Sequence, residues 1–287
     1  MDLQISGRTA IVMGASSGLG LGIAHALSKE GVHVGLLSRD PSRLEAAAAS
    51  LRAVSSARIS CVVADLTSQD AVHAAISTIK DEVGVPDILI GNGGGPPPGS
   101  ATIFDAALWE AQARGMLLPV MTMTNAFLPN MRTNGFGRII MVSSTSVVEP
   151  IPGLVLSNAL RAALANWGRT LAREVARDGI TVNTLMPGRF DTARVQKLNQ
   201  SRANTEGCSA EDVRRQDLET IPAGRYGAPE EFGAVAAFLA SPLASYVTGA
   251  LIPVDGGLLH CSATIWMRER DNQVENGLSW RDKQSAV

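Results

Sequence analysis

The sequence predicts an α/β protein built on a doubly wound parallel sheet of about seven strands, with helices on both faces. Three observations predict it. Short apolar runs alternate with segments of helical length as far as about residue 257. The runs are continuously apolar, as in strands that are buried on both faces. A glycine-rich turn, Gly14 to Gly20, joins the first apolar run to the first helical segment.

The elements follow one another in a regular order. The first strand is expected in RTAIVMG, and a helix follows in GLGLGIAHALSKEG. The second strand, VHVGLLSR, precedes a helix that begins at Pro41, because proline is favoured in the first turn of a helix. Helices are also expected over SQDAVHAAISTIKDEVG, residues 105–131 and residues 153–176, while further strands lie in RISCVVAD, PDILIGN, GRIIMVSS and ITVNTLMPG. The polar residues 189–224 are expected to form a loop that covers the site as a lid.

Composition narrows the class of protein. Hydrophobic residues make up 45%, enough for a sizeable core in one domain spanning residues 1–257. The formal net charge of −2 gives no electrostatic basis for binding nucleic acid or an anionic membrane. No apolar run approaches membrane-spanning length, and the start has no secretory leader. The three scattered cysteines, Cys61, Cys208 and Cys261, favour a reduced cytoplasmic setting, and we expect no metal site.

Residues 258–287 lack the periodicity of the rest of the chain. Trp266 and Trp280 are the only large aromatic residues in this segment. We interpret the segment as a frayed terminus, or alternatively as an arm that docks on a neighbouring subunit.

The glycine-rich turn has the chemistry of a phosphate site. Gly14 permits a tight turn, Gly18 allows the backbone to approach a pyrophosphate, and Gly20 permits close packing of helix on strand. The amino terminus of the following helix supplies N–H groups and positive potential. The spacing G-x-x-x-G-x-G, placed between a strand and a helix, therefore indicates a dinucleotide site.

Four further motifs follow the glycine-rich turn: ADLT, IGNGGG, NTLMPGRFDT and IPAGRYGAPEEFGAVAAFLASPLASYVTGALIPVDGG. With these motifs, the sequence resembles the short-chain dehydrogenase/reductase family over residues 5–257, which implies a single-domain Rossmann fold. The resemblance implies a small-molecule carbonyl or alcohol substrate and a homo-oligomer, either a tetramer or a dimer. It also implies these cofactor-binding residues: Gly14, Ser16, Ser17, Gly18, Leu19, Gly20, Ser38, Arg39, Asp65, Leu66, Asn92, Gly93, Arg161, Pro187, Gly188, Phe190 and Thr192.

The end of the second strand favours NADP(H) over NAD(H). Members of the family that prefer NAD usually carry an acid here to hold the ribose 2′-hydroxyl. This chain has Ser38 followed by Arg39, and a guanidinium suits a 2′-phosphate.

The predicted catalytic set departs from the family's pattern. Ser144 matches the family's serine, but Ser157 and Arg161 stand where the family has tyrosine and lysine. Met116 stands at the position of the family's asparagine. A serine hydroxyl does not ionise as a phenol does, and loss of a positioned general acid typically costs roughly 10²–10⁴ in rate. Glu149 as a replacement acid and Arg189 as a binder of acidic substrates are further hypotheses, each weighed against an ordinary surface role.

Three functions remain open at this point. The first is an NADP-dependent oxidoreductase with Ser144, Ser157 and Arg161 as catalytic residues and an atypical proton path. The second is a catalytically inactive family member that binds NADP as a sensor or partner subunit. The third is a non-redox lyase resembling the halohydrin dehalogenases, which keep the tyrosine and lose the glycine loop, the reverse of this chain.

Overall fold

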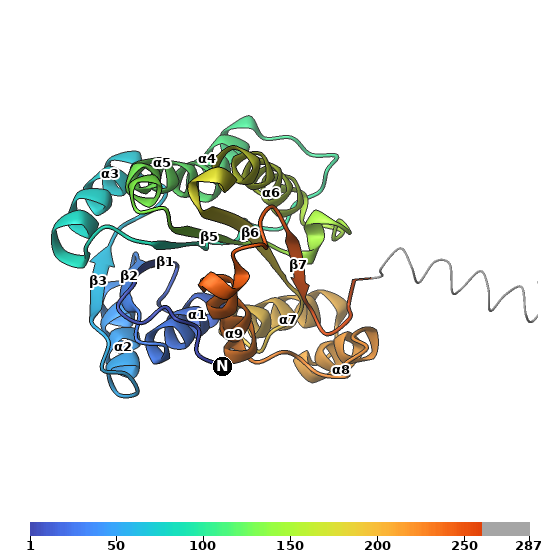
Figure 1. Ribbon diagram of the computed structural model, residues 1–287. Coiled ribbons are helices and arrows are strands. Elements are labelled where there is room, and N and C mark those ends of the chain that lie inside the picture. Colours follow the sequence, from blue (N-terminus) through green and yellow to red (C-terminus); the bar gives the residue numbers. More distant parts are fainter. Residues whose placement is uncertain (260–287) are drawn as a thin grey trace, which may run out of the picture.

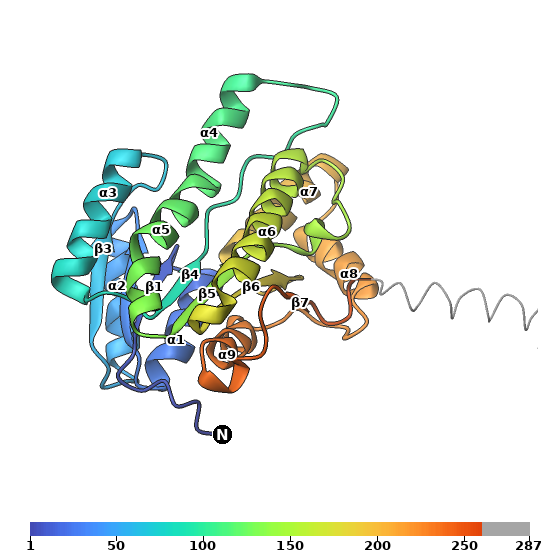
Figure 2. The same ribbon diagram turned by 45° about the horizontal axis from the view of Figure 1, so that its top comes forward.

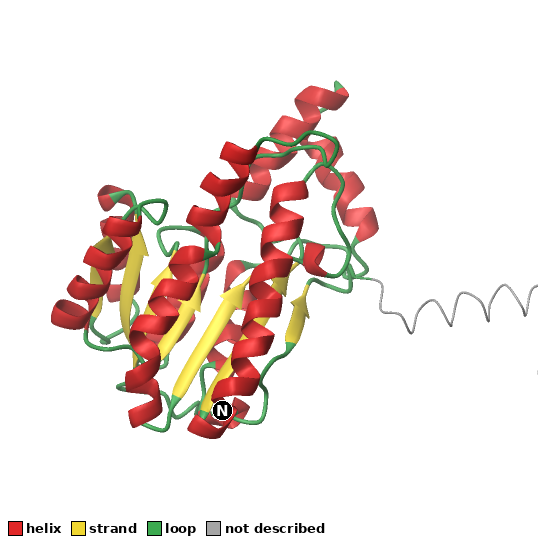
Figure 3. Ribbon diagram, turned by 90° about the horizontal axis from the view of Figure 1, so that it is seen from above, coloured by secondary structure: helices red, strands yellow, loops and turns green. Residues whose placement is uncertain are grey.

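The strands form one sheet in which every neighbouring pair is parallel (Figures 1 and 3). The computed structural model describes residues 1–259, and the predicted tail lies outside them apart from its first two residues. The strand order is β3-β2-β1-β4-β5-β6-β7, which confirms the predicted doubly wound fold. The strands are β1 (Thr9–Met13), β2 (His33–Ser38), β3 (Ile59–Val63), β4 (Ile88–Gly91), β5 (Gly137–Val142), β6 (Ile180–Pro187) and β7 (Leu251–Val254).

Helices cover both faces of the sheet. Figure 1 shows α1, α2 and α9 on one face and α3, α4, α5 and α6 on the other. Figure 2 shows α4 projecting beyond the sheet before the chain continues into α5. The helices are α1 (Gly18–Lys29), α2 (Pro41–Arg52), α3 (Gln69–Thr78), α4 (Ala106–Met116), α5 (Leu118–Thr133), α6 (Val155–Val175), α7 (Ala193–Glu206), α8 (Ala210–Thr220) and α9 (Pro229–Leu239). None of these helices is long and apolar enough to cross a membrane.

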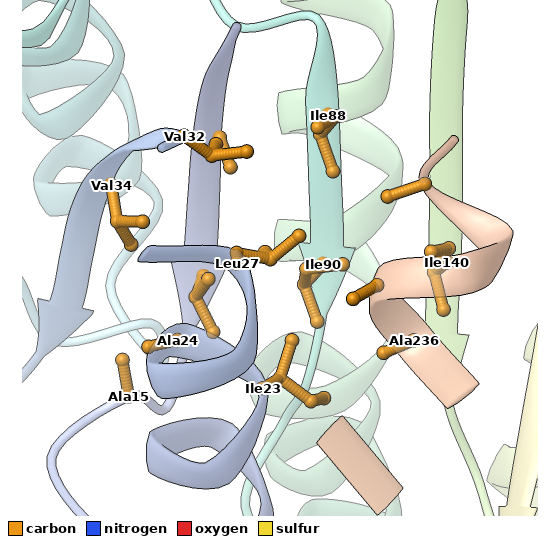
Figure 4. Close-up of a cluster of buried hydrophobic side chains, with 14 of the residues drawn as sticks. Ala15, Ile23, Ala24, Leu27, Val32, Val34, Ile88, Ile90, Ile140 and Ala236 are labelled. Carbon is orange, nitrogen blue, oxygen red and sulfur yellow. The ribbon is translucent and has the colours of Figure 1, made fainter. Parts of the chain in front are cut away.

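The core on the α1 side is made of aliphatic side chains at close range. Ile23 and Leu27 of α1 pack beside Ile90 of β4, and Ala236 of α9 lies near Ile140 of β5 (Figure 4). Burial of each large aliphatic side chain contributes roughly 1.5–3 kcal/mol. The apolar runs of the sequence therefore form the layer between sheet and helices and hold the strand ends in place.

Two segments differ from the sequence-based expectation. The helix expected over residues 105–131 is divided at Leu117 into α4 and α5. Pro119, in the first turn of α5, has no N–H to continue the hydrogen bonding of α4. Residues 189–224, expected as a loop, contain α7 and α8, whose first turns are capped by the side chains of Thr192 and Ser209.

Candidate functional site

The glycine loop lies where the strand order reverses, between β1 and β4. Gly14 and Gly18 have φ values of +61° and +58°, in the left-handed region that favours glycine. A β-carbon on Gly20 would overlap the carbonyl oxygen of Gly14. The side chain of Asn92, just after β4, donates a 3.4 Å hydrogen bond to the same oxygen. The loop is thus a cradle that only glycines can form, tied to the neighbouring strand.

The amino terminus of α1 is open to an anion. Ser17 occupies the cap position, but its side chain makes no capping hydrogen bond. No acidic residue lies in the first turn, which begins Gly18-Leu19-Gly20. The positive end of the helix dipole and its N–H groups are therefore available to a phosphate.

The residues expected at the adenosine end lie along the carboxyl ends of β2 and β3. Ser16 of the glycine loop and Ser38 of β2 share a hydrogen bond of 2.9 Å between their hydroxyl oxygens. Arg39 and Asp65 are exposed just beyond, with Leu66 partly buried next to them. Hydrogen bonds from Thr67 are the main cause that lowers the pKa of Asp65, and the nearby charge of Arg39 contributes. The structure therefore brings this predicted group together at one edge of the sheet.

The three predicted catalytic positions meet at the end of β5. The Nε of Arg161 donates a 3.1 Å hydrogen bond to Ser157 Oγ. Its Nη1 donates to the backbone oxygens of Val142 and Ser143, each at 3.1 Å. Ser144 follows directly, and its Oγ accepts from the backbone N–H of Ser146 at 3.1 Å. The guanidinium therefore fastens α6 to the strand end that carries Ser144.

The environment of this group is partly desolvated. Burial, assisted by the charge of Arg194, lowers the pKa of Arg161 from 12.5 to about 10. The hydroxyl oxygens of Ser143 and Ser146 are buried and have no hydrogen-bond partner within residues 1–259. Met116 is buried against the loop after β4, with its Cα 3.7 Å from where a β-carbon of Gly93 would lie. The position that we aligned with the family's asparagine is thus apolar and buried.

The segment after β6 closes the other side of the glycine loop. Gly188, which follows Pro187, approaches the backbone of Asp255 so closely that a β-carbon would lie 2.7 Å from its Cα. The γ-methyl of Thr192 lies 3.5 Å from the β-carbon position of Gly18. The side chain of Phe190 is buried and packs edge-on against Phe232, with ring centroids 5.2 Å apart.

Glu149 and Arg189, the two residues with further hypothetical roles, lie in different environments. Glu149 is exposed on the loop before α6. Arg189 forms an ion pair of 3.5 Å with the buried Asp217. The residue that sequence reasoning missed is Arg194, in the first turn of α7, whose guanidinium reaches the backbone of Gly95. The polar, aperiodic sequence around it gave no signal of this position.

The doubly wound sheet, the glycine cradle at its switch point and the open helix terminus define a dinucleotide-binding protein of the Rossmann type. Residues 14–259 match a family model described as enoyl-(acyl carrier protein) reductase. The chain belongs to the short-chain dehydrogenase/reductase family, a family of oxidoreductases.

Relatives of known activity match nearly end to end. The chain is 33% identical to D-beta-hydroxybutyrate dehydrogenase of Cupriavidus necator, a match that covers 88% of this chain and 98% of that protein. It is 32% identical to the 3-oxoacyl-(acyl-carrier-protein) reductase of Vibrio harveyi, a match that covers 89% of this chain and 99% of that protein.

Solved structures agree with this placement. L-sorbose reductase from Gluconobacter frateurii, complexed with NADPH and L-sorbose, superposes with a TM-score of 0.86 at 32% identity, covering 91% of this chain and all of that one. A second solved structure is an NADPH-bound short-chain oxidoreductase from Pseudomonas aeruginosa PAO1 that is described as containing an atypical catalytic centre. It superposes with a TM-score of 0.80 at 30% identity, and the match covers 89% of this chain and 98% of that one.

Proposed function

We propose that this protein is an NADP(H)-dependent oxidoreductase that interconverts a small-molecule carbonyl compound and its alcohol, with Ser144, Ser157 and Arg161 as the catalytic residues. The observation that carries the proposal is the hydrogen bond from Arg161 to Ser157 Oγ at the strand end that holds Ser144. This bond supports the proposal because it brings a hydroxyl and a cation together at the two positions that the sequence comparison assigns to the family's tyrosine and lysine.

The residues present fit a dinucleotide phosphate. Gly14, Gly18 and Gly20 leave room that any β-carbon would reduce, and α1 presents its uncapped amino terminus to that room. NADPH bound there would supply the hydride. Ser38 and the exposed Arg39 suit a 2′-phosphate, in agreement with NADPH in both structural relatives described above.

Ser157 is suited to donate a hydrogen bond to the carbonyl oxygen. Its oxygen accepts the Nε–H of Arg161, so its own hydrogen is free to point toward a substrate. The cation behind it stabilises negative charge as it develops on the substrate oxygen. Burial lowers the pKa of Arg161 to about 10, which still leaves the guanidinium protonated near pH 7, so it acts as a fixed positive charge and the proton that the substrate oxygen takes up comes from solvent.

Removing the Ser157 hydroxyl tests the proposal. Ser157→Ala is expected to lower kcat for NADPH-dependent carbonyl reduction roughly 10²-fold, the typical effect of losing one such donor. Affinity for NADPH, followed by fluorescence titration, should stay unchanged, since Ser157 is placed at the substrate. Thr170→Ala, which removes an exposed hydroxyl farther along α6, is the matched control. Equal activity of Ser157→Ala and native protein would contradict the assignment.

A second candidate is an NADP-binding protein without turnover. The buried Met116, which we align with the family's asparagine, favours it, because a thioether is only a weak hydrogen-bond acceptor and cannot replace the donor and acceptor of an asparagine amide. If the protein binds NADPH tightly but no carbonyl compound in a broad panel causes its oxidation, this second candidate is favoured over the first. The third hypothesis, a non-redox lyase resembling the halohydrin dehalogenases, is disfavoured because those enzymes lose the glycine loop that this chain retains.

A further inference from the structure

Arg194 differs from every other arginine in the segment that follows β6. Six arginines lie between residues 189 and 225, and the other five each have a carboxylate partner within 4.0 Å. The pairs are Arg189–Asp217, Arg202–Asp217, Arg214–Asp191, Arg215–Asp212 and Arg225–Glu231. For Arg194 the part of the chain that the structure describes offers no carboxylate and no hydrogen-bond acceptor.

The side chain of Arg194 bridges two walls of the site. Its backbone belongs to the first turn of α7, two residues beyond Thr192. Its guanidinium lies against Gly95, where a β-carbon would overlap Cζ and both terminal nitrogens. Gly95 belongs to the loop after β4, three residues beyond Asn92. The cation therefore spans from α7 to the carboxyl edge of the sheet, in space that only glycine at position 95 leaves open.

A second cation lies close by. The charge of Arg194 is one of the causes that lower the pKa of Arg161, and desolvation lowers the pKa of Arg194 itself. Arg161 is the more desolvated of the two, whereas Arg194 is exposed to solvent, so an anion can reach Arg194 from the surface. An anion that binds there reduces the repulsion between the two guanidinium groups. Arg161 is already held by Ser157 and two backbone oxygens, so the free donors belong chiefly to Arg194.

We propose that Arg194 binds a carboxylate of the substrate, so that the protein acts on oxo acids or hydroxy acids. The inference rests on the proposed function and extends it: Ser157 would hold the reacting oxygen while Arg194 holds the acid group. The cofactor pyrophosphate is the other anion expected nearby. It has its own place at the glycine loop and the amino terminus of α1, whereas Arg194 reaches Gly95, on the loop after β4.

Matched acids and esters test the proposal. NADPH oxidation is measured with 4-oxopentanoate, 5-oxohexanoate and 4-formylbenzoate, and with the methyl ester of each. We expect at least one acid to exceed its ester at least tenfold in kcat/KM. Arg194→Gln should lower that kcat/KM by roughly 10–100-fold, chiefly through KM, because a charge-assisted hydrogen bond is lost. The esters and the Kd for NADPH should be unaffected.

The control is Lys197→Gln, which removes an exposed cation from the same helix and should change nothing. An equal loss on acids and esters would overturn the inference, as would a comparable rise in the Kd for NADPH, which would assign Arg194 to the pyrophosphate.

If no carbonyl compound is reduced, the proposed function fails and the carboxylate site is tested alone. Titration calorimetry of 4-formylbenzoate into the protein with NADP⁺ then decides: binding that Arg194→Gln abolishes supports the site, and no binding overturns it.

Discussion

At the scale of single residues, an arginine at position 161 changes what the site can do. A lysine would offer a point charge, whereas Arg161 offers a planar fork of five donors. Nε holds Ser157 and Nη1 holds two backbone oxygens of the β5 end. Within residues 1–259, Nη2 has no acceptor, so two donors remain for a cofactor ribose or a substrate oxygen. The same side chain thus serves both the fold and the proposed chemistry.

Arg39 should set the preference between the two nicotinamide cofactors. It is exposed directly after β2, next to Ser38, where a 2′-phosphate would lie. Arg39→Glu is expected to weaken NADP(H) binding by roughly 10–100-fold relative to NAD(H), because a charge-assisted contact becomes a repulsion. Fluorescence titration of both cofactors measures it, with Arg43→Glu on the exposed face of α2 as the control. Tighter binding of NAD(H) by the native protein would refute the preference.

At the scale of elements, an acid-sensitive contact holds the start of α9. The carboxylate of Glu231 accepts hydrogen bonds of 2.8 and 2.7 Å from Arg225 and one of 2.8 Å from the backbone N–H of Ala228. The bonds from Arg225 are the main cause that lowers the pKa of Glu231 from 4.5 to about 2. A carboxyl with a lowered folded-state pKa stabilises the fold above its unfolded pKa and loses that contribution as the pH falls.

Glu231→Gln should therefore melt below the native protein at pH 7, and the difference should shrink as the pH falls from 4.5 toward 2. Because both side chains are exposed, the effect should be small and should weaken with salt. Thermal melting at several pH values measures it, and Glu230→Gln, one residue earlier in α9, is the control. A difference that persists at pH 2 would contradict the explanation.

The sequence predicted elements whose cause is local. Continuous apolar runs marked the strands, and the glycines of the first turn marked a backbone that needs positive φ at Gly14 and Gly18. The apolar pattern of residues 105–131 predicts one continuous helix, which Pro119 divides into α4 and α5. The helices α7 and α8 carry few buried residues, so their periodicity was too weak to detect. Arg194 meets Gly95 only through the tertiary fold, and no spacing in the sequence could have predicted that contact.

At the scale of the whole molecule, exposed apolar side chains precede β7, one of the two edge strands of the sheet. β7 ends the strand order, and the chain that leads into it carries three large exposed side chains, Phe238, Leu243 and Tyr246. Tyr246 is fully exposed. Exposed apolar side chains and an open sheet edge each favour association with another chain.

We therefore expect a homo-oligomer, a tetramer, in which two copies meet through this edge. A tetramer needs a second contact, and the long helix α6 suits it. This helix lies on the opposite side of the sheet from α9 (Figure 1), and its partly buried Trp167 adds apolar surface.

Light scattering at micromolar concentration should give about four times the chain mass. Leu243→Asp with Tyr246→Asp should reduce it to a dimer, since these charges would be desolvated without partners in the proposed contact. Val54→Asp, at an exposed apolar side chain beyond α2, should leave the mass unchanged. A monomeric native protein would refute the proposed assembly. If the double variant has the same mass as the native protein, the contact does not involve Leu243 and Tyr246.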